Sequence, residues 1–161
     1  MRKVGVIGGT GLYSLEGLKV KEEKKIVTPF GEPSDSFILG EMEGIEVVFL
    51  SRHGRGHRIL PSEINYRANI YAFKVLGVER IISVSAVGSL KEDIHPMDVV
   101  IPEQFFDRTK RRIDTFFGDG IVAHVGVADP VCPVLSDILF ESARKEGAIV
   151  HKGGTYVTIE G

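Results

Sequence analysis

Three short segments of the sequence combine glycines with side chains that can bind an oxyanion. They are Gly8-Gly9-Thr10-Gly11, Arg52-His53-Gly54 and Ser85-Ala86-Val87-Gly88-Ser89. Glycine lets a ligand approach backbone N–H groups because it has no Cβ atom, and such amide-lined turns suit phosphate. An arginine can hold phosphate through two parallel hydrogen bonds, while hydroxyl and imidazole groups add single donors. Taken singly, the glycine-rich turn is equally compatible with a plain turn, and the Ser85 segment is a weak signal. The Arg-His-Gly-Arg-Gly-His string after the second run favours a functional role over a surface turn. A single binding site requires that the three segments meet.

Each of these segments directly follows an apolar run that is typical of a strand. The runs are Val4-Gly5-Val6-Ile7, Val47-Val48-Phe49-Leu50 and Ile81-Ile82-Ser83-Val84. In open α/β sheets ligands bind at the carboxyl ends of the strands. If the three strands are neighbours in one sheet, their ends converge on a single anion.

The wider sequence pattern predicts a mixed central β-sheet flanked by helices, in a single α/β domain. A short polar link between 36–40 and 45–51 favours a β-hairpin. Ser62 is expected to cap a helix that ends at Leu76, before Gly77. The other expected elements are a buried strand at 3–7, strands at 80–85, 99–106, 148–150 and 155–159, and a helix at 133–145 with Leu135, Ile138, Leu139 and Ala143 facing inward.

A nicotinamide-dependent oxidoreductase is one alternative, because Gly5, Gly8 and Gly11 approach a dinucleotide-binding fingerprint. That fingerprint requires a long amphipathic helix after the loop and then a parallel strand with an acidic end. Residues 14–26 are instead highly charged and poorly periodic. A non-catalytic module that binds phosphate or a nucleotide is a second alternative.

Composition narrows the classes of partner. A formal net charge of −2 gives no basic surface for nucleic acid or for an anionic membrane, and no apolar stretch approaches the ~20 residues of a membrane span. The single cysteine, Cys132, cannot form an intrachain disulfide, which suits a reducing cytoplasm. The histidines lack the spacing of a metal site, so no metal is expected.

Several segments, in order along the whole chain, resemble the methylthioadenosine phosphorylases, within the trimeric purine nucleoside phosphorylase superfamily. The matching segments are Val6-Ile7-Gly8-Gly9-Thr10-Gly11, Thr28-Pro29-Phe30-Gly31 with Pro33-Ser34, Arg52-His53-Gly54, Asn65-Tyr66-Arg67-Ala68-Asn69-Ile70, Ala86-Val87-Gly88-Ser89-Leu90 and Val157-Thr158-Ile159-Glu160-Gly161. This ordered set is far more specific than any single glycine pattern.

The resemblance implies reversible phosphorolysis of 5′-methylthioadenosine to adenine and 5-methylthioribose 1-phosphate, with inorganic phosphate as co-substrate and no other cofactor. The phosphate-binding residues that it implies are Thr10, Arg52, His53, Ser85 and Ala86, in loops supported by Gly8, Gly9 and Gly88. The family often has threonine where Ser85 stands, which keeps the hydroxyl. His124 matches a position that reaches the 5′ end of the nucleoside in a neighbouring subunit, so a homotrimer, or a hexamer of two trimers, is implied.

Residues 1–161 correspond to the N-terminal portion of a single nucleoside phosphorylase domain in that family. Family members continue past Ile159-Glu160-Gly161 with about a hundred more residues, which include the aspartate that handles the purine ring. No catalytic residue is therefore expected within this chain, and a 6-oxopurine nucleoside phosphorylase stays open as an alternative. The expected setting is the cytoplasm, in purine and methionine salvage.

Overall fold

The structure is a computed structural model that describes residues 3–9, 12 and 14–160. It divides into two compact units, and each is described by itself. The first comprises Met1–Val87 with Ile113–Phe116, and the second comprises Gly88–Arg112 with Phe117–Gly161. All three glycine-containing segments begin in the first unit.

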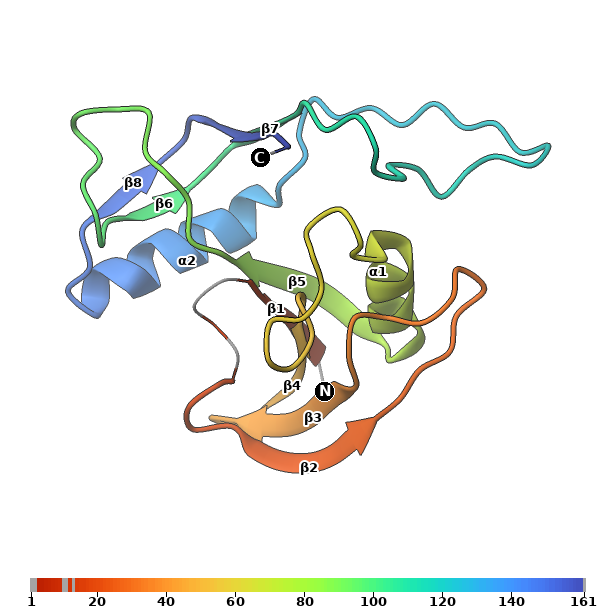
Figure 1. Ribbon diagram of the computed structural model, residues 1–161. Coiled ribbons are helices and arrows are strands. Elements are labelled where there is room, and N and C mark those ends of the chain that lie inside the picture. The colour runs from red at the N-terminus through yellow and green to blue at the C-terminus, as the bar shows by residue number, and fades with distance from the viewer. Residues whose placement is uncertain (1–2, 10–11, 13, 161) are drawn as a thin grey trace. The chain divides into compact units, whose positions relative to one another are not determined.

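The first unit is built on a five-stranded mixed sheet in the order β2-β3-β4-β1-β5 (Figure 1). β1 runs parallel to both β4 and β5, whereas β2, β3 and β4 pair antiparallel. The strands are β1 (Lys3–Gly8), β2 (Lys19–Lys24), β3 (Phe37–Met42), β4 (Ile45–Ser51) and β5 (Val78–Val84). The predicted hairpin and mixed sheet are confirmed, and β1 lies between the two later strands.

Helix α1 (Tyr66–Val75) joins β4 to β5 and packs on the sheet beside β5 (Figure 1). Its Phe73 is fully buried and meets Phe37 edge to face, with ring centroids 5.0 Å apart. Phe73 also explains Gly5, because a Cβ atom at Gly5 would lie 2.8 Å from its ring. The core around this contact consists of Ile7, Phe37, Val48, Leu50, Ala72, Phe73 and Leu76.

Two features of this unit differ from the sequence-based expectations. The strand β2 was not predicted, because all six of its residues are exposed at the sheet edge and show no apolar alternation. The helix begins at Tyr66 rather than after Ser62, since the Asn65 side chain accepts a hydrogen bond from Ala68 N at 3.1 Å and is the N-cap. Its predicted end before Gly77, which has φ 77°, is confirmed.

The second unit contains helix α2 (Pro133–Lys145) and two short parallel strand pairs. β6 (Val99–Ile101) pairs with β8 (Val150–Lys152), and β7 (Gln104–Asp107) pairs with β9 (Thr155–Thr158). The sequence predicts one strand over 99–106 with an edge or a bulge at Pro102. The structure has two strands instead, because pairing breaks at Pro102, which has no N–H to donate. Ile138 of α2, predicted to face inward, is 55% exposed, so that part of the prediction is wrong. No helix among the described residues is long and apolar enough to cross a membrane.

Candidate active site

The three strand ends singled out in the sequence lie side by side in the sheet. Gly8, at the end of β1, is in register with Ser51 of β4 on one side and with Val84 of β5 on the other. Beyond these pairs, Arg52 N donates to Gly8 O at 2.8 Å and Gly9 N donates to Val84 O at 2.7 Å. The parallel pairing therefore brings the carboxyl ends of the three strands to one edge of the sheet, as the sequence predicted.

Gly9 is the point at which these segments come closest. A Cβ atom placed on Gly9 would lie 2.8 Å from Arg52 Nη2 and 2.8 Å from Ser85 Cβ. Real Cβ atoms essentially never make contacts that short. Glycine is therefore needed here because the neighbouring groups lie too close for a Cβ atom. Backbone conformation is not the reason, because the φ of Gly9 lies outside the positive range. Arg52 and Ser85 consequently flank the same backbone turn.

The guanidinium of Arg52 retains bonding capacity at this turn. Its Nε atom is buried and has no hydrogen-bond partner among the described residues. Its Nη2 atom lies 3.4 Å from Nε2 of His53, which is a long contact. A buried donor of a permanent cation left unpaired is costly, and an anion bound here would remove that cost.

His53 is held in one tautomer by the loop that contains it. The side chain is only 3% exposed, and Nδ1 lies 2.9 Å from Ile59 O. A carbonyl oxygen only accepts, so Nδ1 carries the proton and Nε2 of the neutral ring faces Arg52 as an acceptor. The ring also stacks on His57, with centroids 4.3 Å apart. Burial lowers the pKa of His53, and the nearby Arg52 and His57 lower it further against the opposing effect of the Ile59 hydrogen bond.

We expect the His53 imidazole to titrate below its ordinary value of about 6.5, and sulfate to raise that pKa. Sulfate keeps its charge across this range, so a bound sulfate stabilises the imidazolium without titrating itself. NMR titration of the ring proton in the full-length protein measures both effects, and a His53→Gln variant identifies the signal by its loss. A midpoint at or above 6.5 in the anion-free protein contradicts the prediction.

The lowered pKa of His53 also makes the stability of the folded protein depend on pH. Because the folded-state pKa is depressed, the contribution of His53 to stability is complete above pH 6.5 and is lost as the pH falls through the folded value. The free energy of unfolding, measured with urea at pH 7 and below pH 6, should therefore fall more in the native protein than in the His53→Gln variant.

The other residues implied by the resemblance are placed less closely. Ser85 is half-buried, whereas Ala86 and Gly88 are exposed after the end of β5. Thr10 lies outside the described residues. His124 lies in an exposed loop of the second unit, and its role in a neighbouring site stays a prediction.

Three residues that hold the site loops were not given a role from the sequence. Asn69 of α1 is 2% exposed; its Oδ1 accepts from Ser34 N at 2.8 Å and its Nδ2 donates to Ser34 Oγ at 2.9 Å. Asp35 accepts from Arg55 N at 2.5 Å, in the loop that follows Arg52 and His53. The only sequence signal was the recurrence of Ser34 and Asn69 in the matching segments, and nothing local distinguished Asp35 from an ordinary turn residue.

The context of the glycine turn differs from that of a dinucleotide fold. Among the described residues between β1 and β2 there is no helix, and β2 pairs antiparallel with β3. A dinucleotide site needs a helix N-terminus at this point to face the pyrophosphate. Nor do the described residues include a group of three or more His, Cys, Asp or Glu side chains that could hold a metal ion.

A family model described as the phosphorylase superfamily matches residues 3–161, and the chain belongs to that superfamily. The mixed sheet, and the meeting of the ends of β1, β4 and β5 at one edge of it, agree with this assignment.

Individual relatives are similar over almost the whole of this chain. The S-methyl-5′-thioadenosine phosphorylase of Koribacter versatilis (strain Ellin345) is 58% identical over 159 residues, which cover 99% of this chain and 54% of the relative. The crystal structure of a methylthioadenosine phosphorylase from an antarctic soil metagenomic library has a TM-score of 0.93 at 55% identity, covering 99% of this chain and 57% of that one. A methylthioadenosine phosphorylase from Schistosoma mansoni in complex with adenine has a TM-score of 0.95 at 38% identity, covering 100% and 66%. The chain thus spans about half the length of the curated relatives it matches.

Proposed function

We propose that the complete protein carries out reversible phosphorolysis of 5′-methylthioadenosine, releasing adenine and 5-methylthioribose 1-phosphate. The proposal rests on membership of the phosphorylase superfamily and on the names of relatives at 58% and 55% identity. Residues 1–161 are proposed to be the N-terminal portion of a single nucleoside phosphorylase domain that contributes the phosphate half of the site.

The observation that carries this assignment is the setting of Arg52. Its Nε is buried and has no partner in the part of the chain that the structure describes, and its side chain flanks Gly9 together with Ser85 where three strand ends meet. We assign Thr10, Arg52, His53, Ser85 and Ala86 to phosphate binding. Gly8, Gly9 and Gly88 are assigned to the loops that place them.

This arrangement suits a displacement at the anomeric carbon of a nucleoside. As the bond to the purine breaks, positive charge develops on the ribose, and a phosphate dianion fixed beside the ring stabilises that charge and then forms the new C–O bond. Fixing a nucleophile in place can supply roughly 7–11 kcal/mol of the barrier reduction. The departing purine takes up a proton from a general acid, which we place in the part of the protein outside this chain.

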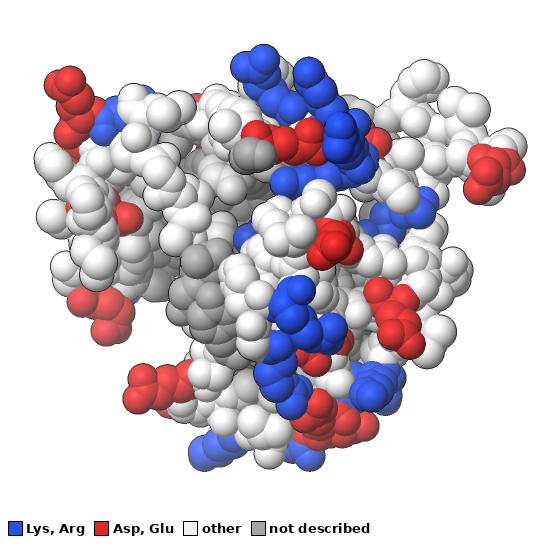
Figure 2. All heavy atoms as spheres, in the orientation of Figure 1, with Lys and Arg blue, Asp and Glu red and all other residues white. Residues whose placement is uncertain are grey.

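The partners and setting follow from the same proposal. Inorganic phosphate acts as co-substrate, and no further cofactor or metal takes part. We propose a homotrimer, or a hexamer of two trimers, in which His124 reaches the 5′ end of the nucleoside in a neighbouring subunit. The single cysteine fits a cytoplasmic location. Acidic and basic side chains are interspersed on the face seen in Figure 2, which favours a small-molecule ligand over nucleic acid.

The test is phosphate-dependent release of adenine from methylthioadenosine by the full-length protein, compared with release of hypoxanthine from inosine. Faster release of adenine supports the proposed substrate. Faster release of hypoxanthine assigns a 6-oxopurine nucleoside phosphorylase instead. Absence of phosphate dependence with both nucleosides overturns the proposed reaction.

A further inference from the structure

The loop that carries Arg52 and His53 is held in part by a residue from outside the loop. Gly54 and Gly56 have φ of 70° and 80°, and His57 has φ of 55°, a region that side chains other than glycine rarely adopt. Within the loop, Arg58 N and Ile59 N both donate to His53 O, at 3.1 and 3.0 Å. The intervening amide of Arg55 instead donates outside the loop, to Asp35 Oδ2.

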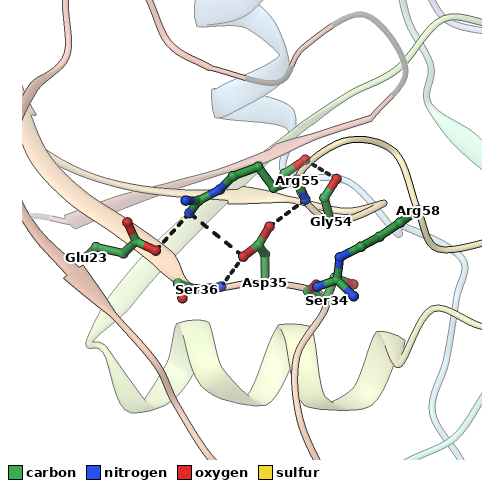
Figure 3. Close-up of polar contacts among 8 residues, drawn as sticks. Glu23, Ser34, Asp35, Ser36, Gly54, Arg55 and Arg58 are labelled. Atoms are coloured by element: carbon green, nitrogen blue, oxygen red, sulfur yellow. Dashed lines mark hydrogen bonds and ion pairs between the residues drawn. The ribbon is translucent and has the colours of Figure 1, made fainter.

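Asp35 uses both of its carboxylate oxygens on backbone amides. Oδ2 accepts from Arg55 N at 2.5 Å and Oδ1 accepts from Ser36 N at 2.8 Å. The carboxylate thus joins the segment that leads into β3 to the turn after β4, as Figure 3 shows. Its side chain is 14% exposed, so solvent screens these bonds only in part. The Arg55 guanidinium is less involved, since it lies 3.9 Å from Asp35 Oδ1 and pairs mainly with Glu23 at 2.8 Å.

The segment that carries Asp35 is itself fixed. Ser34 is 4% exposed and makes two hydrogen bonds to the buried Asn69 of α1. Its carbonyl oxygen faces the site loop, where a Cβ atom on Gly54 would lie 3.1 Å away and Arg58 Nη2 lies at 3.4 Å. Hydrogen bonds therefore hold Ser34 to helix α1, and the next residue in the chain, Asp35, holds the loop.

We propose that Asp35 is a positioning residue for the phosphate-binding loop, acting through the Arg55 amide to hold Arg52 and His53 in place. This inference rests on the proposed function for its consequence, because a misplaced loop should weaken phosphate binding. Loss of the Asp35 carboxylate should therefore weaken the binding of phosphate and leave the binding of the nucleoside almost unchanged.

The sharpest test is Asp35→Asn, which keeps the shape of the side chain but leaves a single acceptor oxygen for two amides. In the full-length protein we expect the KM for phosphate to rise about 5- to 20-fold, with the KM for methylthioadenosine changed less than twofold. Hydrogen exchange of the peptide over 52–59 should become faster. The matched control is Glu23→Gln, which makes the same chemical change on the exposed partner of Arg55 and should alter neither quantity.

A second variant separates geometry from charge. Asp35→Glu keeps the negative charge and both oxygens but moves them by one methylene, so it should also raise the KM for phosphate. Calorimetric titration with inorganic phosphate gives the same comparison without turnover. Unchanged phosphate binding in folded Asp35→Asn overturns the positioning role and leaves the proposed reaction intact. If phosphate binding weakens in Asp35→Asn but the native protein shows no phosphorolysis, the positioning role of Asp35 is supported and the proposed reaction is overturned.

Discussion

Replacing Arg52 by alanine should lower kcat/KM for phosphate by about 30-fold or more while changing the affinity for the nucleoside little. Truncating one member of a buried, hydrogen-bonded charge pair costs at least about 2 kcal/mol, and each 1.36 kcal/mol is a factor of ten in rate. Arg52 should show this loss because its Nε is buried without a protein partner among the described residues. Initial rates of adenine release at varied phosphate and fixed methylthioadenosine measure the effect.

Two further variants test whether the loss of activity toward phosphate comes from the guanidinium of Arg52. Arg52→Lys keeps the charge but loses the planar fork, so it should recover only part of the activity. Arg80→Ala removes an exposed arginine from β5, four residues before the strand reaches the site, and should leave the phosphate dependence unchanged. Equal losses toward phosphate and nucleoside in Arg52→Ala would contradict the assigned role.

Replacing Gly9 by alanine should disturb both flanks of the same site in one step. The new methyl group would stand 2.8 Å from Arg52 Nη2 and 2.8 Å from Ser85 Cβ, so at least one of these side chains must move. Overpacking of this kind costs about 1–3 kcal/mol of stability. We expect a lower midpoint of thermal unfolding. We also expect kcat/KM for phosphate to fall about 10- to 100-fold, on the basis of about a factor of ten for each of the two side chains, Arg52 and Ser85, that is displaced.

A matched glycine is available as the control for that experiment. A Cβ atom on Gly126 would meet nothing within 4 Å among the described residues, and its φ lies outside the positive range. Gly126→Ala should therefore keep both the unfolding midpoint and the phosphate dependence of the native protein. If Gly9→Ala also kept both, Arg52 and Ser85 could not lie as close to the turn as the structure places them.

The sequence alone could predict the site segments because each follows an apolar run and begins with glycine or a polar donor. The ends of β1, β4 and β5 were recognisable in this way, and so was the hairpin of β3 and β4. The order of strands in the sheet could be stated only as a condition, since no local pattern dictates that β1 lies between β4 and β5. The register that pairs Gly8 with both Ser51 and Val84 is likewise a property of the folded sheet.

What the sequence could not predict depends on contacts between distant residues. Asp35 and Arg55 are 20 positions apart, and their hydrogen bond involves a backbone amide that has no sequence signature. The edge strand β2 has no buried face and so shows no periodicity. The start of α1 was misplaced because Ser62 and Asn65 are both good caps, and only the folded chain shows which side chain reaches an amide.

The position of β1 between β4 and β5 has a consequence for biosynthesis. The β1 segment leaves the ribosome before the strands on either side of it, and Val78–Val84 emerges some seventy residues after Lys3–Gly8. β4 can pair with one edge of β1 earlier, but the hydrogen-bonding groups on the other edge stay unpaired until that later strand is available. The hydrogen bond from Gly9 N to Val84 O therefore forms late in the folding of this unit, and the proposed anion binding beside Gly9 would report that β5 has joined the sheet.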